Sequence, residues 1–238
     1  MKKSKRIIFI LLAALISAYF LFLLFPEIFF RYKVEYKSFI LYTHSDPGKN
    51  IFQILDSAEK LISRSELYKK ETKKYKLFLC GDFPEYSFFA PTEMHAFASN
   101  NILTNNIFLS KSNILENRIE RNGKENNFRT LSGTIAHEAT HTLIKIDLGF
   151  IKYLFLNTWK NEGYADFIAK ESSFKFIIGM YFICNSQTPS SPSFKYFKYR
   201  LYFEYLIDFK KLSFNEIAGR NFNVIDLDKQ IQKKYCGK

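Results

Sequence analysis

The chain has 238 residues, a length typical of one catalytic domain rather than two. Hydrophobic residues make up 47% of the sequence and aromatic residues 18%, so the chain can bury a core and is not an intrinsically disordered segment. The formal net charge is +12, but no basic motif typical of a nucleic-acid-binding fold accompanies it, so we expect no nucleic-acid partner.

The N-terminus predicts a membrane anchor. Residues 1–6 form a basic flank, and residues 7–25 follow without a charge. At about 1.5 Å per helical residue this run covers roughly 28 Å, close to the hydrocarbon thickness of a bilayer. A cleaved signal peptide is the competing interpretation, but the small residues Ser17 and Ala18 lie inside the run and more apolar residues follow them. A core helix would need a polar face, which this run lacks.

Basic residues flank the uncharged run 7–25 on both sides, and their distribution predicts its orientation in the membrane. Those before it are Lys2, Lys3, Lys5 and Arg6, and those after it are Arg31, Lys33 and Lys37. The narrow excess on the N-terminal side favours a cytoplasmic N-terminus and an extracytoplasmic domain.

A further basic cluster comprises Lys69, Lys70, Lys73, Lys74 and Lys76. We interpret it as a solvated basic face near anionic lipid headgroups. The three cysteines are Cys80, Cys184 and Cys236, too few and too far apart for a cysteine-rich zinc site. In an oxidising compartment they allow one disulfide and one free thiol, and the spacing does not say which two pair.

The rest of the chain predicts an α+β fold, with a small N-terminal β-sheet and helices followed by a mainly helical half. Residues 26–37 are interpreted as a juxtamembrane connector, and residues 38–238 as one domain. The predicted elements of that domain are a strand at 38–43, a turn at 45–48, an amphipathic helix at about 50–66, strands at 76–80 and 107–110, helices from Phe128 onward, and a Ser/Pro-rich loop at 186–193 between two helical stretches. The strand at 107–110 is either an edge strand that pairs with an extended peptide or a core strand, and both interpretations stay open.

The segment His137-Glu-Ala-Thr-His141 is an H-E-x-x-H pattern and indicates a metal site. On a helix, residues four apart lie on the same face, so both imidazoles can reach one ion, and Glu138 lies one step along, where it can hold a water. A helix is expected here because Leu131, Ile135, Ala139, Leu143 and Ile146 recur at helical spacing. We expect Asn126 or Asn127 to cap its start and Gly149 to suit its end.

Zinc in a catalytic site takes a third protein ligand and leaves a fourth position for water. Glu162, some twenty residues after His141, is the candidate, at a distance that allows a second helix to return. Asp166 lies four residues further on, on the same helical face, where it can accept the N–H of a ligand imidazole. A solvated helix face is the alternative for these two carboxylates, and their spacing from the H-E-x-x-H pattern favours the ligand interpretation.

These residues resemble the gluzincin metallopeptidases, in which H-E-x-x-H is followed by a glutamate ligand on a second helix. The arrangement of Asn161, Glu162 and Asp166 looks like the thermolysin-type version, and the segment 159–165 is similar to the W-x-x-E-G-x-A segment of peptidase MA-like proteins. The resemblance implies a zincin-type helical half, Zn²⁺ held by His137, His141 and Glu162, and supporting roles for Asp166 and Asn161. It spans about residues 131–169, with a looser similarity at 196–206, and does not cover the anchor or residues 31–120.

The ligand set implies hydrolysis by a metal-activated water with Glu138 as the general base. A donor for the oxyanion is still needed, and the candidates are Tyr196, Tyr199, Arg200, Tyr202 and Tyr205. Family-like spacing favours Tyr196. His44 and His95 have no ligand-spaced partner, so we expect them to be ordinary loop or surface residues.

The leading hypothesis is therefore a membrane-anchored, zinc-dependent peptidase that acts on peptide or protein substrates. One alternative is a catalytically inactive, membrane-tethered binding protein that retains a zincin fold. Another is an anchored scaffold in which the motif is accidental. Structural zinc sites are usually closed by four protein ligands, and the three found here favour the peptidase.

Overall fold

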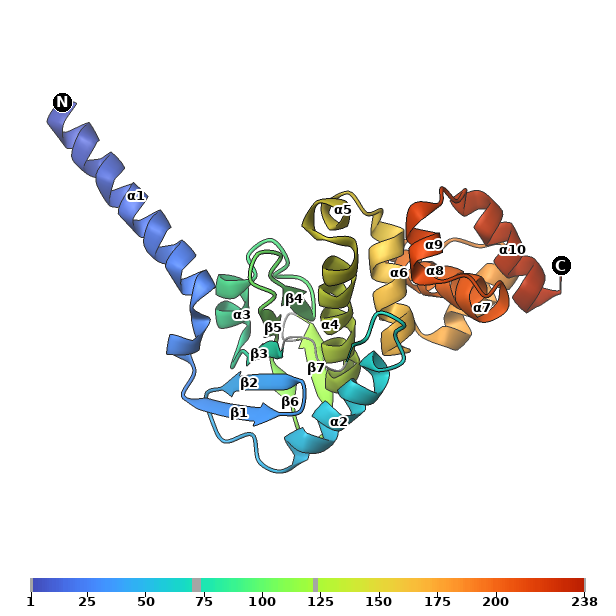
Figure 1. The fold of residues 1–238 in the computed structure, drawn as a ribbon, viewed down its shortest axis with the longest axis horizontal. Helices are drawn as coiled ribbons and strands as arrows, with labels where there is room; N and C mark the ends of the chain where they lie inside the picture. The colour runs from blue at the N-terminus through green and yellow to red at the C-terminus, as the bar shows by residue number, and fades with distance from the viewer. Residues whose placement is uncertain (1, 70–73, 122–123, 238) are drawn as a thin grey trace.

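The computed structural model of the chain describes residues 2–69, 74–121 and 124–237. Lys70 and Lys73 of the predicted basic cluster lie outside these residues, as do Met1 of the basic flank and Lys238. The first element, α1 (Lys2–Leu24), projects from the domain as a long isolated helix (Figure 1). Its segment Lys5–Leu24 is long and apolar enough to cross a membrane and has no residue buried within the protein, as expected for an anchor.

The segment predicted as a connector is folded instead. A 3₁₀ helix, η1 (Pro26–Phe29), is followed by strand β1 (Tyr32–Tyr36), which pairs antiparallel with β2 (Phe39–Thr43). The connector prediction for residues 26–37 is therefore wrong. The apolar residues of β1 alternate with Lys33 and Glu35, as is typical of a strand, and Val34 and Tyr36 pack against the core.

The remaining basic cluster is partly neutralised by this segment. Lys74 Nζ lies 2.7 Å from Glu35 of β1, and Lys76 Nζ lies 2.5 Å from Glu27 of η1. Two of the expected surface charges are thus paired with carboxylates, and the basic face is smaller than the sequence suggested.

The domain is α+β, and its main sheet is mixed. Among the described residues, five strands lie in the order β1-β2-β3-β5-β4, with β3 at Tyr75–Leu79, β4 at Ala98–Asn100 and β5 at Ile107–Leu109. The inner pairs β2–β3 and β3–β5 are parallel, whereas β1 and β4 run antiparallel to their neighbours. Helix α2 (Asn50–Ile62) and helix α3 (Phe83–Phe89) make the connections. The strands predicted at 38–43, 76–80 and 107–110 are confirmed.

The central strands contribute side chains to two hydrophobic cores, one on each face of the sheet, because successive side chains of a strand point to opposite faces. Leu77 and Ile107 face the larger core, against α2 and the later helices. Phe78 and Phe108 face a smaller aromatic core on the other side of the sheet, with Tyr86 and Phe89 of α3. Leu23 of α1 packs against this smaller core, so the end of α1 is part of the folded domain.

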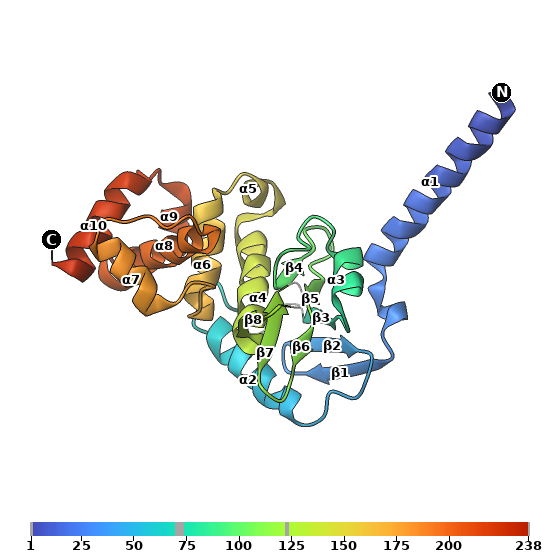
Figure 2. The same cartoon turned by 180° about the vertical axis from the view of Figure 1, so that it is seen from behind.

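A second sheet, β6 (Ser112–Asn113), β7 (Arg118–Arg121) and β8 (Lys124–Thr130), precedes the central helix α4 (Leu131–Leu148) and lies beside it in Figure 2. The predicted helix start near Phe128 is wrong, because residues up to Thr130 pair with β7. Thr130, not Asn126 or Asn127, caps α4 through its side-chain oxygen, which accepts from the Gly133 N–H. Gly149 ends the helix with a positive φ of 78°, as expected.

The C-terminal half is helical. Its elements are α5 (Phe150–Leu154), α6 (Thr158–Ala169), α7 (Phe176–Cys184), α8 (Pro192–Phe203), the π-helical η2 (Glu204–Phe209), α9 (Phe214–Gly219) and α10 (Val224–Cys236). The predicted loop at 186–193 joins α7 to α8. A disulfide links Cys184 to Cys236 and so joins the ends of α7 and α10, while Cys80 is free and buried.

Helices α6 and α8 approach closely at Gly163, the residue after the predicted glutamate ligand. A Cβ added to Gly163 would lie 2.6 Å from the Tyr199 carbonyl oxygen, which belongs to the α8 backbone and cannot move by a rotamer change. We expect Gly163→Ala to force the helices apart and lower the free energy of unfolding by about 1–3 kcal/mol. Chemical denaturation followed by the fluorescence of Trp159 would measure the change.

Gly219→Ala is the matched control, because a Cβ there meets no atom within 4 Å. Its expected effect is below about 1 kcal/mol. Equal unfolding midpoints for the two variants would contradict the close packing of α6 on α8.

Candidate metal centre

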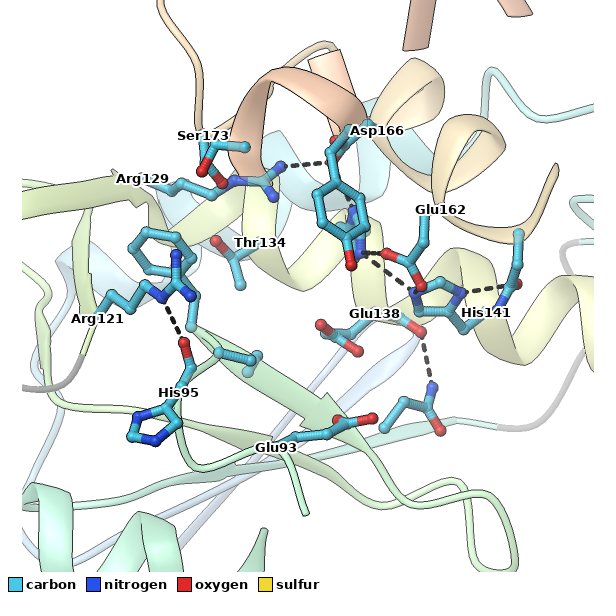
Figure 3. Close-up of a pocket in the computed structure, with 18 of the residues that line it drawn as sticks. Glu93, His95, Arg121, Arg129, Thr134, Glu138, His141, Glu162, Asp166 and Ser173 are labelled. Carbon is cyan, nitrogen blue, oxygen red and sulfur yellow. Dashed lines mark hydrogen bonds and ion pairs between the residues drawn. The ribbon is translucent and has the colours of Figure 1, made fainter. Parts of the chain in front are cut away.

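Helices α4 and α6 bring the predicted ligand residues together. His137 and His141 lie one turn apart on α4, and Glu162 of α6 lies close to both. Figure 3 shows Glu162 pointing toward His141. One donor atom from each of the three lies within 4.8 Å of the others, and the two histidines are buried. Among the described residues this is a cluster with the composition of a metal site.

The distances between the donor atoms suit one small ion. The Nε2 atoms of His137 and His141 are 3.1 Å apart, and carboxylate oxygens of Glu162 lie 3.4 Å and 3.7 Å from them. A tetrahedral ion with ligand distances of about 2.0–2.1 Å separates its donor atoms by about 3.3 Å. An ion of the size of Zn²⁺ therefore fits between the three side chains with little rearrangement.

Each imidazole is held by its other nitrogen, which directs Nε2 at the ion position. His137 Nδ1 lies 2.8 Å from Asp166 Oδ1, and His141 Nδ1 lies 2.9 Å from Asn161 Oδ1. Because both partners accept through oxygen, each Nδ1 carries a proton, and Nε2 is the nitrogen that a metal would bind. The structure thus places Asp166 and Asn161 where the sequence predicted supporting residues.

Arg129, at the end of β8, is a site residue that the sequence analysis missed. Its Nη2 lies 3.0 Å from Asp166 Oδ1, and its Nε lies 3.0 Å from Glu171 Oε1. The side chain is buried, so its charge is balanced by these two carboxylates rather than by water. No spacing signal marked Arg129, because its partners lie far along the chain on α6 and just beyond it.

Buried charges set the proton affinities at the cluster. Burial by itself lowers the pKa of His137, but the carboxylates of Asp166 and Glu162 outweigh it and raise that pKa to about 10 when no metal is present. Burial raises the pKa of Glu162, and the two adjacent imidazoles outweigh it and lower the pKa to about 2. Glu162 therefore stays ionised and available to a cation at neutral pH.

Glu138 has the environment of a general base. It is buried on α4, and this burial raises its carboxyl pKa to about 8. Its backbone carbonyl accepts from Asn100 Nδ2 at 2.7 Å, which fixes the helix against strand β4. Its side chain faces a cavity across which lies Glu93, another residue without a sequence signal (Figure 3).

The cavity beside the cluster measures about 380 Å³ and is large enough for a few residues of an extended chain. Its wall includes Tyr196 of α8 and Tyr153 of α5, and Asn161 Nδ2 donates to the Tyr153 hydroxyl at 3.4 Å. Burial, reinforced by the charge of Glu162, raises the pKa of the Tyr196 phenol, so it remains a donor at neutral pH. Tyr153 was missed because α5 is too short to show a periodic pattern.

The other oxyanion candidates from α8 and η2 point elsewhere. Arg200 pairs with Glu204, and the Tyr202 hydroxyl donates to Asp228. Tyr199 and Tyr205 are buried in the larger core. Of the five candidates, only Tyr196 lies among the described residues that line the cavity.

The two isolated histidines do not join the cluster. His44 Nε2 lies 2.7 Å from Glu85 Oε1, and the His44 ring stacks on the Phe30 ring. His95 lines the far wall of the cavity, where its backbone carbonyl accepts from Arg121 (Figure 3). His95 is thus a loop residue, as expected, but one that faces the site.

The strand that borders the cavity is β4, not the predicted segment 107–110. Strand β5 pairs with β3 on one side and β4 on the other, so the interpretation of 107–110 as an edge strand is wrong and the core-strand alternative is confirmed. Strand β4 lies at the edge of the sheet, and Ala98 and Asn100 line the cavity. Its three residues were too short a run to be recognised.

Comparisons of the chain with protein-family profiles, with curated proteins and with solved structures find no significant match.

The raised pKa values of His137 and Glu138 predict that metal binding depends on pH. A metal must displace the proton of His137, whose pKa is about 10, and the added positive charge also expels the proton of Glu138 below about pH 8. We expect the apparent zinc affinity to rise with pH, by about a hundredfold per pH unit between pH 6 and 7.5, where two protons are released. Competition with a chromophoric chelator at several pH values would measure the slope.

Glu138→Gln is the control, since it removes one of the two titrating groups and leaves the ligands in place. Its expected slope is about tenfold per pH unit over the same range. An affinity that does not change with pH in the native protein would contradict this assignment of protons.

Proposed function

We propose that the protein is a membrane-anchored, zinc-dependent peptidase of the gluzincin type. The observation that carries the proposal is the convergence of His137, His141 and Glu162 beside the buried carboxyl of Glu138. Three protein ligands leave room for a water. The positive charge of a bound ion would ionise the Glu138 carboxyl, whose pKa burial raises to about 8, so that it could accept a proton from that water. A mainly helical half that follows a mixed sheet is consistent with a zincin-type domain.

Zinc, when bound, supplies a Lewis acid that acidifies water and polarises the scissile carbonyl. Glu138 accepts the proton of the attacking water and returns it to the leaving amine. Asp166 and Asn161 keep the imidazoles in place, and Arg129 keeps the Asp166 carboxylate oriented and ionised. Tyr196 is our candidate for the donor that stabilises the oxyanion, because its phenol lines the cavity near Glu162.

An extended peptide suits the cavity wall formed by β4. The outer edge of an antiparallel edge strand offers backbone N–H and C=O groups to another chain, and β4 lies beside the Glu138 segment of α4. This pairing recognises backbone rather than side chains, which favours peptides or proteins as the substrate class.

We place the N-terminus in the cytoplasm and the domain outside it. The charge bias around α1 supports this orientation, with four basic residues before the span and three after it. The disulfide between Cys184 and Cys236 supports it independently, because disulfides persist in oxidising compartments and are rare in the cytosol.

The decisive test is Glu138→Gln. We expect hydrolysis of a fluorogenic peptide library to fall by about 10²–10⁴-fold, with one zinc ion per chain retained, because the ligands are intact and the general base is lost. Peptide turnover and metal content would be measured on the same preparations.

Glu116→Gln is the matched control, since that carboxylate is exposed and is not among the described residues that line the cavity. It should retain full activity. Absence of turnover in the native, zinc-loaded protein would favour a binding protein that keeps the site, and absence of stoichiometric zinc would favour an accidental motif.

A further inference from the structure

An apolar surface unrelated to the cavity lies at the end of α4 and on α5. Its members are exposed aliphatic and aromatic side chains, which we call the α5 surface: Ile102, Leu103, Ile146, Phe150, Ile151, Leu154 and Phe155. The most exposed are Phe155 at 83%, Leu103 at 70% and Ile151 at 65%. Scattered apolar residues are normal on a protein surface, but a group of this size in neighbouring segments marks an interaction site.

The α5 surface is built on ordered backbone. Helix α5 has no buried residue, yet its first turn is fixed by the Tyr153 N–H, which donates to the Gly149 carbonyl at 3.0 Å. The Tyr153 side chain turns inward to the metal cavity, where its hydroxyl meets Asn161. Tyr153 therefore forms part of the cavity wall, while the other apolar side chains of α5 are exposed on the surface.

The turn that carries Ile102 and Leu103 is also structured and adjoins the end of α4. The Asn101 side chain accepts from the backbone N–H groups of Leu103 and Thr104 at 3.0 and 3.1 Å. Lys145 Nζ donates to the Ile102 carbonyl at 2.6 Å, which joins this turn to the helix that precedes α5. The two parts of the α5 surface are thus held next to each other.

The anchor helix leaves the domain on the same side. In Figure 1, α1 leaves the domain in the upward direction, and α5, the loop beside β4 and the α9–α10 region lie along the upper edge of the domain. The orientation of α1 is set by contacts, because the Tyr19 hydroxyl donates to the Phe88 carbonyl at 2.8 Å and the two rings meet edge to face. Since Tyr19 lies within the apolar span, a bilayer that holds this span brings Phe88 to the level of its surface.

We propose that the α5 surface is a lipid-binding surface that inserts into the bilayer holding α1, and this rests on the anchor in the proposed function. Short segments with exposed Phe, Ile and Leu beside basic residues bind at the boundary between headgroups and acyl chains. Lys152 on α5 is exposed beside these apolar side chains, and anionic headgroups attract such a charge. The inserted surface and the anchor together hold the metal cavity close to the bilayer.

Helix α7 offers a contrast within the same chain. Its exposed apolar side chains include Ile177, which is 84% exposed, but α7 lies at the opposite end of the domain from α1 (Figure 1). A label at Ile177 therefore has the same local chemistry as one at Phe155 and a different distance from the membrane.

The test uses the full chain in nanodiscs of phosphatidylcholine and phosphatidylglycerol, with nitroxide labels at Leu103→Cys and Phe155→Cys. Ile177→Cys is the matched control, and Ala14→Cys reports on the anchor. The native chain checks that the buried Cys80 and the Cys184–Cys236 disulfide take up no label. Collision rates with oxygen and with a water-soluble nickel chelate are measured by electron paramagnetic resonance.

We expect the labels at 103 and 155 to collide more with oxygen than with the chelate, and the label at 177 to show the reverse. Aqueous behaviour at 103 and 155 would overturn the lipid surface. So would dipolar coupling between the 155 labels of two chains in one disc without preference for oxygen, which would assign the α5 surface to a second copy.

Failure of the anchor is distinguishable from failure of the surface. An aqueous label at 14 would overturn both the anchor and the lipid surface, whereas a membrane-buried label at 14 with aqueous labels at 103 and 155 would overturn the surface alone. The peptidase proposal is tested separately by the turnover of Glu138→Gln.

Discussion

The carboxylate of Asp166 accepts from His137 and from Arg129, and both contacts are buried. It therefore joins three elements at once: α6, which carries it, α4, which carries the imidazole, and β8, which ends in the arginine. A buried carboxylate lowers the free energy of unfolding unless such partners balance its charge. Separation of the helices would therefore leave the Asp166 carboxylate or the Arg129 guanidinium without its partner. The same constraint that holds the helical half on the sheet also fixes the direction of the His137 imidazole, a candidate metal ligand.

The parts of the site that the sequence predicted are those whose partners are near in the chain or repeat with a helical period. His137 and His141 are one turn apart, and Glu162 and Asp166 are again one turn apart, so helical geometry alone gives each pair a common face. Arg129, Glu93 and Tyr153 reach the same cavity from a strand end, a loop and a five-residue helix. Their positions depend on long-range packing, which leaves no periodic trace in the sequence.

The same distinction accounts for the fold. The buried inner strands, with Leu77 and Phe78 on opposite faces, are apolar runs that a pattern reveals, and the α+β class follows from their order. The edge strands β1 and β4 and the sheet of β6–β8 are short or polar, and they form because a neighbour offers hydrogen bonds. Thr130 shows the effect at one residue, since it ends β8 and caps α4, a double role that the Asn pair before it could not fill.

The connection between α1 and the sheet has a consequence for the kinetics of the protein. Only residues 25–31 separate the end of α1 from β1, and fully stretched they would span roughly 25 Å, less than the width of a domain of this size. With α1 in a bilayer, as we propose, the candidate metal centre is confined to a thin layer above that one membrane. Encounter with a partner in the same bilayer would then be a two-dimensional search, whose rate follows the surface density of that partner.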